Sequence, residues 1–141
     1  MKAQDFFNEK FFEVHGALED EKNNRYLLVK CKVAALRQER QHHNSGEMLC
    51  LNIKEYFEGL QSRSLPLILD MFSVMFMDHS GLLALCHGKR GGRSYHGGKF
   101  IVAYAQEPVL RLIRNTQFDE VFDLRENLDC FSKVCSATRL V

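Results

Sequence analysis

The chain has 141 residues, of which 45% are hydrophobic and 26% are charged, and its formal net charge is +1. A chain of this length buries roughly two-thirds of its unfolded surface on folding, so it needs neither disulfides nor a structural metal. The near-zero net charge gives no reason to expect nucleic-acid binding, and the composition is that of an ordered globular protein. We therefore expect one domain that spans residues 1–141.

Five cysteines are spread along the chain without a C-x-x-C pair, most of them among apolar neighbours: Cys31, Cys50, Cys86, Cys130 and Cys135. This distribution predicts buried free thiols in a reducing compartment. The opening residues MKAQDFFNEK are too charged for a signal peptide, and no apolar run reaches the length of about 18 residues that a membrane span needs. The sequence therefore predicts a cytoplasmic protein that does not insert directly into a membrane.

The first third of the chain predicts a β-hairpin. Residues 26–33, YLLVKCKV, alternate apolar and polar side chains, as a half-buried strand does. Residues 11–20 are expected to pair with them across the polar turn EKNNR. Residues 35–46 show no apolar period, so we expect an exposed loop there.

An amphipathic helix is predicted after that loop, with Asn44 or Ser45 as its N-cap and Glu47 in its first turn. Apolar side chains then recur at helical spacing and predict one buried face. They are Leu49, Ile53, Tyr56, Phe57 and Leu60.

Residues 65–77 and 99–105 are apolar enough to be strands that are covered on both faces of a sheet. Helices are predicted to start near residue 82 and at Pro108. A short strand near 120–124 precedes a closing helix, capped by Asp123 and Glu126, that buries Leu128, Phe131 and Cys135. The order β-β-α-β-α-β-α-β-α predicts an α/β fold, with a mixed, mostly parallel sheet opened by the N-terminal hairpin and about four helices packed against it.

Asp78, His79 and Ser80 lie in a row between two apolar runs and suggest two kinds of site. A catalytic Ser-His-Asp triad needs three side chains that converge in space, and consecutive residues seldom do so. The nucleophile elbow G-x-S-x-G is missing as well. The other interpretation, which we favour, is a strand end followed by a helix start, where Asp78 or Ser80 caps the helix. A phosphate attached to a hydroxyl there would lie near unpaired N–H groups and the positive end of the helix dipole.

Two stretches of the chain resemble the STAS domain family, the fold of bacterial anti-sigma factor antagonists. LILDMFSVMFMDHSGLLAL resembles the family's central signature, in which an apolar strand ending in Asp leads to Asp-Ser-Ser-Gly-Leu and a helix. GGKFIVAYAQEPVLRLIRNTQFDEVFDL, which begins with Gly97 and Gly98, resembles the Gly-Gly turn, buried strand, helix and acidic-apolar segment that follow. The resemblance covers residues 65–128, and the first 64 residues match only in the order of elements.

The resemblance implies a binding protein rather than an enzyme, without a cofactor. Ser80 corresponds to the family's phosphorylated serine, and Asp70 to the acidic end of the central strand. The implied partners are a serine kinase of the GHKL type that acts as an anti-sigma factor and phosphorylates Ser80 with ATP, and a phosphatase that resets the protein. The implied partner-binding residues follow the motif: Asp78, His79, Ser80, Gly81 and Leu82. The alternative is a non-phosphorylated STAS module of an anion or lipid transport complex or of another signalling complex.

The chain departs from the family pattern in two places. His79 replaces a small hydroxyl residue, and it is either an exposed residue without a role or an imidazole that helps to hold a phosphoryl group or restricts which kinase fits. Gly88, Gly91 and Gly92 interrupt the expected helix, which predicts a short helix and a solvated basic loop within 88–98. Contact of that loop with a nucleotide or an acidic patch of a partner is the weaker alternative, since the Walker pattern is missing. No histidines and cysteines stand at ligand spacing, so we expect no metal.

Overall fold

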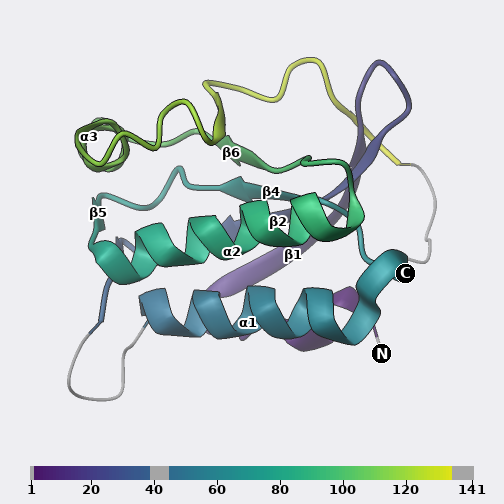
Figure 1. Ribbon diagram of the computed structural model, residues 1–141, viewed down its shortest axis with the longest axis horizontal. Coiled ribbons are helices and arrows are strands. Elements are labelled where there is room, and N and C mark those ends of the chain that lie inside the picture. The colour runs from purple at the N-terminus through teal and green to yellow at the C-terminus, as the bar shows by residue number, and fades with distance from the viewer. Residues whose placement is uncertain (1, 39–44, 135–141) are drawn as a thin grey trace.

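The computed structural model describes residues 2–38 and 45–134 and shows an α/β fold (Figure 1). Six strands form the main sheet in the order β7-β6-β4-β2-β1-β8. Their bounds are β1 (Phe12–Glu19), β2 (Arg25–Cys31), β4 (Leu67–Asp70), β6 (Ile101–Ala103), β7 (Asp123–Arg125) and β8 (Ser132–Lys133). A small second sheet pairs β3 (Ala35–Leu36) with β5 (Phe76–Met77). The helices are α1 (Ser45–Leu60), α2 (His79–Tyr95) and α3 (Glu107–Asn115), with 3-10 turns η1 (Ala3–Phe6) and η2 (Gln61–Arg63).

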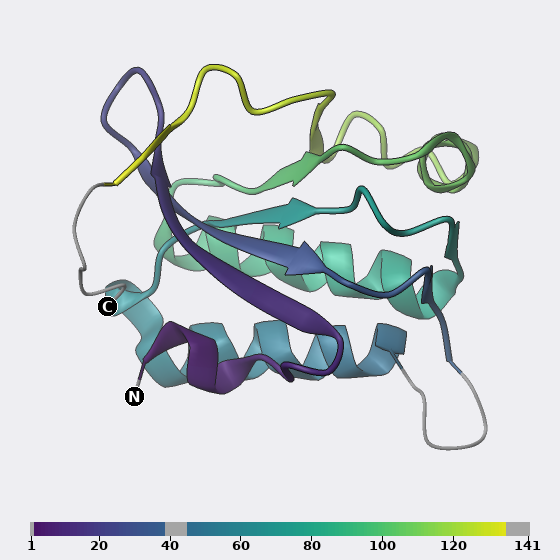
Figure 2. The ribbon, with the colours of Figure 1, turned by 180° about the vertical axis from the view of Figure 1, so that it is seen from behind.

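The strand directions confirm the predicted mixed, mostly parallel sheet. Strands β2, β4, β6 and β7 are parallel neighbours, and β1 pairs with β2 and with β8 in antiparallel fashion. The β1–β2 hairpin turns through residues 20–24, as predicted, and its ladder shifts register between Val14 and Gly16. Viewed from behind, this long hairpin crosses in front of the two large helices (Figure 2).

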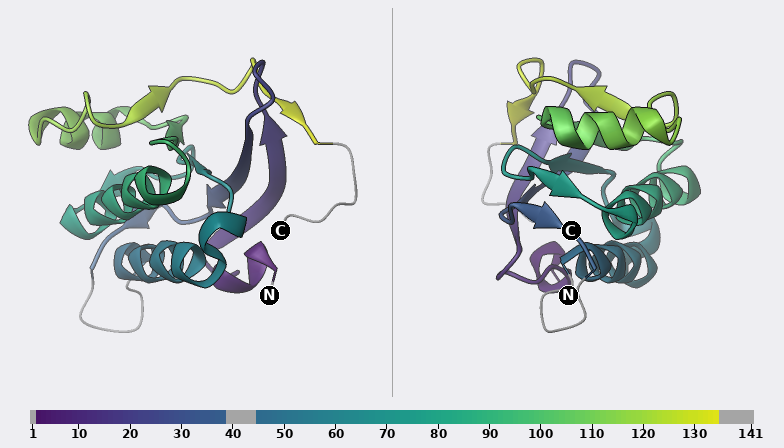
Figure 3. Two further views of the ribbon diagram at one scale, coloured as in Figure 1. Left: turned by 45° about the vertical axis from the view of Figure 1, so that its right-hand side comes forward. Right: turned by 90° about the vertical axis from the view of Figure 1, so that its left-hand side faces the viewer.

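Helices α1 and α2 lie side by side on one face of the sheet and begin at the same end of the molecule (Figure 1). Strand β4 shows how the two faces differ. Leu67 and Leu69 belong to the main core beneath the helices, whereas Ile68 belongs to a smaller cluster on the opposite face. There the C-terminal segment, yellow in Figure 3, covers the sheet with Leu128 and Phe131. A strand between these two layers is apolar on both sides, as the sequence indicated.

The predicted closing helix is wrong, and the described residues contain three α-helices rather than about four. Asp123 begins strand β7 instead of capping a helix. The side chain of Asn127 accepts a hydrogen bond from the N–H of Asp129 at 3.1 Å, a local turn that competes with helix formation. Phe131 still packs inward, with its ring 5.6 Å from that of Tyr26. Cys135 lies outside the described residues.

The predicted strand 65–77 is also too long. Strand β4 ends at Asp70, whose carboxylate Oδ1 accepts a hydrogen bond from the N–H of Phe72 at 2.9 Å. This side-chain contact turns the backbone out of the ladder. The chain returns to a strand only at β5, which lies in the second sheet.

The prediction that residues 35–46 form an exposed loop is wrong for both ends that the structure describes. Leu36 is fully buried and pairs with Met77, and Ser45 is the first residue of α1 and is buried. Residues 39–44 lie outside the described residues. The apolar face predicted for α1 is confirmed, since its five members are all buried.

The three glycines do not interrupt α2, so the predicted short helix and solvated basic loop are wrong. Helix α2 has 17 residues, and all three glycines are buried in it. An added Cβ would lie 2.3 Å from the ring of Phe100 at Gly88, 2.1 Å from the ring of Phe57 at Gly91 and 2.1 Å from the carbonyl oxygen of Lys99 at Gly92. These positions therefore let α2 pack closely on its neighbours, which offsets the low helix propensity of glycine.

Helix α2 ends at the Gly-Gly turn that the sequence indicated. Gly97 and Gly98 have φ values of 64° and 89°, the left-handed region that favours glycine. The N–H of Gly98 donates to the carbonyl of Gly92 at 2.9 Å, and the Lys89 ammonium donates to the carbonyl of Gly98 at 2.9 Å. The turn thereby directs the chain into the buried strand β6.

The prediction of generally buried thiols holds for Cys31 alone among the described cysteines. Cys50 and Cys86 are half-buried, Cys130 is exposed, and all four are free thiols.

Within the described ranges, none of the helices combines the length and apolar composition that crossing a membrane requires.

Substitution of Gly92 by Ala should destabilise the protein by about 1–3 kcal/mol, because the new methyl group meets the rigid backbone carbonyl of Lys99. The matched control is Ser94→Ala on the exposed side of the same helix, which should change the free energy of unfolding by no more than about 0.5 kcal/mol. Urea unfolding of both variants measures the difference. A Gly92→Ala protein as stable as the control would contradict the close packing of α2.

Candidate functional site at the start of helix α2

The Asp-His-Ser sequence lies where the small second sheet passes into α2. Strand β5 ends at Met77, Asp78 is the N-cap, and His79 is the first helical residue. The backbone N–H of Asp78 donates to the carbonyl of Leu36 at 3.0 Å, which ties the cap to strand β3. The site therefore includes a segment more than 40 positions earlier in the chain.

The carboxylate of Asp78 accepts hydrogen bonds with both of its oxygens. Oδ1 accepts from the backbone N–H of Ser80 at 2.8 Å and from the Ser80 hydroxyl at 2.5 Å. Oδ2 accepts from the backbone N–H of Gln38 at 2.8 Å. Partial burial raises the pKa of Asp78, but the hydrogen bonds from Ser80, Gln38 and Gly81 outweigh it and leave the pKa below its ordinary value. The cap thus carries a negative charge at neutral pH.

Ser80 is half-buried, and its hydroxyl faces the first turn of α1. A Cβ added at Gly46 would lie 1.9 Å from the Ser80 Oγ and 2.8 Å from the Ser80 Cβ. The carbonyl of Ser80 accepts a hydrogen bond from the Cys50 thiol at 3.3 Å. The two helix starts are therefore in direct contact around Ser80.

The geometry gives no support to a catalytic triad. Ser80 hydrogen-bonds to Asp78 directly, and the side chain of His79 between them is exposed. A triad would instead need the imidazole to join the hydroxyl and the carboxylate. Among the described residues, no three or more His, Cys, Asp or Glu side chains are grouped so that they could hold a metal ion.

The other residues singled out in the sequence fall into different environments. Gly81 and Leu82 are both buried at the helix start, so neither residue contributes to an accessible surface. Asp70 is half-buried at the end of β4. His79, by contrast, is exposed on the first turn of α2.

Exposed apolar side chains flank the helix start in the sequence. Those before the helix were not foreseen because the run 65–77 suggested a fully buried strand. Phe72 is 61% exposed and Phe76 is 52% exposed. We call the following four residues the apolar rim: Phe72, Met75, Phe76 and Leu83. Exposed apolar surface that forms a contiguous patch is typical of an interaction site, and these four side chains fall within twelve residues of sequence.

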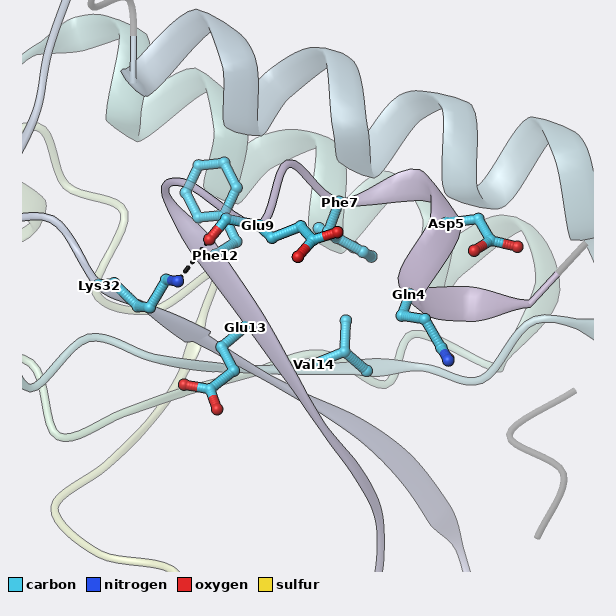
Figure 4. Close-up of a pocket in the computed structure, with 8 residues that line it drawn as sticks. All are labelled: Gln4, Asp5, Phe7, Glu9, Phe12, Glu13, Val14 and Lys32. Atoms are coloured by element: carbon cyan, nitrogen blue, oxygen red, sulfur yellow. Dashed lines mark hydrogen bonds between the residues drawn. The ribbon is translucent and has the colours of Figure 1, made fainter.

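A pocket of about 550 Å³ lies elsewhere, between the N-terminal segment and β1 (Figure 4). The carboxylates of Asp5, Glu9 and Glu13 lie around it, and the Lys32 ammonium donates to the carbonyl of Glu9. None of the site residues predicted from the sequence lines this pocket.

Replacement of Asp78 by Asn should make folding less sensitive to acid. The pKa of Asp78 is lowered in the folded state, so the charged carboxylate stabilises the fold above the unfolded pKa of about 3.9, and this contribution is lost as the pH falls through the folded pKa. Urea unfolding at about pH 7 and about pH 3 should therefore show a smaller loss of stability for Asp78→Asn than for the wild type. An equal loss in both proteins would show that Asp78 contributes nothing to it.

Comparison with known proteins places the fold. The sequence model of the STAS domain matches residues 11–131. The crystal structure of a proposed anti-sigma factor antagonist from Thermotoga maritima superimposes with a TM-score of 0.56 at 14% sequence identity, covering 72% of this chain and 81% of that one. No curated protein matches the sequence.

The family match extends well into the N-terminal half, which resembled the family only in the order of its elements. The Thermotoga maritima structure independently supports the fold. The chain belongs to the STAS domain family.

Proposed function

We propose that the protein is a phosphorylation-gated binding protein, similar to anti-sigma factor antagonists, and that Ser80 is the residue modified. The observation that carries the proposal is the position of the Ser80 hydroxyl, which is half-buried on the first turn of α2 and held by the Asp78 carboxylate at 2.5 Å. The protein itself catalyses nothing in this scheme. It binds a serine kinase, receives a phosphoryl group from ATP, and is reset by a phosphatase.

The start of α2 is electrostatically suited to such a modification. The N-terminal N–H groups of a helix and its dipole favour negative charge. A phosphoryl group would add about two negative charges at the surface, beside the carboxylate that now accepts the hydroxyl hydrogen bond. Modification would therefore change both the charge that a partner meets and the local hydrogen bonding.

The apolar rim supplies the contact area for the partner in this proposal. Phe76 and Leu83 are both more than half exposed and stand on either side of the cap in sequence. Buried apolar anchors supply much of the affinity of a protein interface, while a nearby charge changes whether the interface can form. We propose that the unmodified surface binds the kinase and that the phosphorylated surface does not.

Phosphopeptide mapping of the protein from its native source, or after incubation with a cognate GHKL-type kinase and ATP, tests the modification. Trypsin releases residues 64–89 as one peptide, which contains Ser64, Ser73 and Ser80. We expect fragmentation to place the phosphoryl group on Ser80, because Ser64 is buried at 3% exposure and Ser73 does not stand at a helix start. Ser80→Ala should abolish the label. Label at another residue would refute the proposed site, and a transport protein that copurifies with an unlabelled chain would favour the alternative function.

Binding of the same kinase should depend on charge at Ser80 and on the apolar rim. Ser80→Asp should weaken binding by introducing charge where the partner packs, whereas Ser80→Ala should bind constitutively. Phe76→Ala should raise the Kd by about tenfold or more, the loss typical of an aromatic anchor. Val121→Ala is the matched control, because Val121 is 41% exposed but stands outside the rim. Isothermal titration calorimetry measures all four, and equal affinities for Phe76→Ala and Val121→Ala would exclude the rim.

A further inference from the structure

We propose that the first turn of α1, together with the end of β3, is the second half of the switch: a phosphoryl group on Ser80 displaces this turn from α2. The inference rests on the proposed function only in taking Ser80 as the modified residue. It extends the switched surface from α2 to a segment that the family motif does not contain. Two independent contacts of the cap residues lead to it.

The first contact is steric. Gly46 packs so closely on Ser80 that even one added carbon at Gly46 would lie 1.9 Å from the Ser80 Oγ and 3.1 Å from the N–H nitrogen of Gly81. Gly46 and its neighbour Ser45 are both buried. A phosphoryl group attached to this Oγ therefore has no space on the side of α1. Either the turn moves away or the side chain of Ser80 rotates out of its present position.

The second contact is electrostatic, and it acts even when the side chain rotates. A phosphorylated Ser80 has no hydroxyl proton left to donate to Asp78 Oδ1, and its new charge repels the carboxylate. The other oxygen of that carboxylate holds the backbone N–H of Gln38 at 2.8 Å. Displacement of Asp78 therefore removes the hydrogen bond that holds Gln38, two residues after β3.

The two contacts converge because β3 and α1 are joined by hydrogen bonds. The N–H of Gly46 donates to the carbonyl of Arg37 at 3.1 Å, and the N–H of Arg37 donates to the Ser45 hydroxyl at 3.2 Å. The Ser45 hydroxyl in turn donates to the carbonyl of Ala35 at 2.7 Å. Movement of either Gly46 or Gln38 therefore affects both the end of β3 and the first turn of α1.

The reactivity of the Cys50 thiol can be used to measure separation of α1 from α2. Its half-buried thiol donates to the carbonyl of Ser80 at 3.3 Å. Burial raises the pKa of this thiol to about 11, so it reacts slowly with thiol reagents while the helices are in contact. Movement of the first turn of α1 exposes it.

The main experiment uses the full chain with phosphoserine incorporated in place of Ser80 during synthesis, so that no kinase is needed. Hydrogen exchange followed by mass spectrometry should show several-fold faster exchange of the amides of residues 49–51, which depend on the first turn of α1. Residues 56–60 of the same helix serve as the internal control and should not change. Cys50 should also react several-fold faster with a thiol reagent, relative to the exposed Cys130. Unchanged exchange and unchanged Cys50 reactivity would overturn the inference, even where kinase labelling of Ser80 succeeds.

A double-mutant cycle tests the steric contact separately. Gly46→Ala should lower the Tm in the wild-type background, because the methyl group meets Ser80. In a Ser80→Gly background, which removes both the Oγ and the Cβ, the same substitution should lower the Tm by clearly less, because only the 3.1 Å contact with the Gly81 backbone nitrogen remains. An equal change in Tm in both backgrounds would show that Ser80 does not press on α1 and would refute the steric step.

Discussion

The close approach of helices α1 and α2 is the constraint on which the rest of the structure depends. Glycine stands at the contact points at both ends: Gly46 meets Ser80 where the helices begin, and Gly91 meets the ring of Phe57 further along. A side chain at either position would push the helices apart, because protein cores leave no space for it. This spacing lets both helices cover the same face of a short sheet, and it brings the start of α1 against the start of α2.

The N-cap residue of α2, Asp78, connects two segments that are far apart in the sequence. The Asp78 carboxylate is bonded to Ser80 on its own helix and to Gln38 at the end of β3. A group that alters Ser80 acts on both segments, since the hydrogen bonds share one carboxylate. The same arrangement differs from a Ser-His-Asp triad: the carboxylate and the hydroxyl are hydrogen-bonded to each other, and the histidine side chain is exposed.

The surroundings of the cap combine features that stability alone does not require. The apolar rim exposes four large side chains within a dozen residues of sequence, although burying them would favour folding. The Ser80 hydroxyl and the Asp78 carboxylate stand between Phe76 and Leu83 in the sequence. Together, these residues are consistent with a surface that binds a partner and is controlled by charge, which is the function we propose.

Much of this architecture was determined by the sequence itself. The alternation in residues 26–33 predicted β2, and the helical spacing from Leu49 to Leu60 predicted the buried face of α1, because both patterns arise within a single element. The motif around Ser80 predicted a strand end and a helix start.

Tertiary structure alone decided the rest. Gly88, Gly91 and Gly92 suggested a loop until the neighbours that need their small size were seen, and Leu128 and Phe131 needed no helix to cover the second face. The contacts of Ser80 with Gly46 and of Asp78 with Gln38 join residues more than 30 positions apart, and no local pattern records a contact that only packing creates.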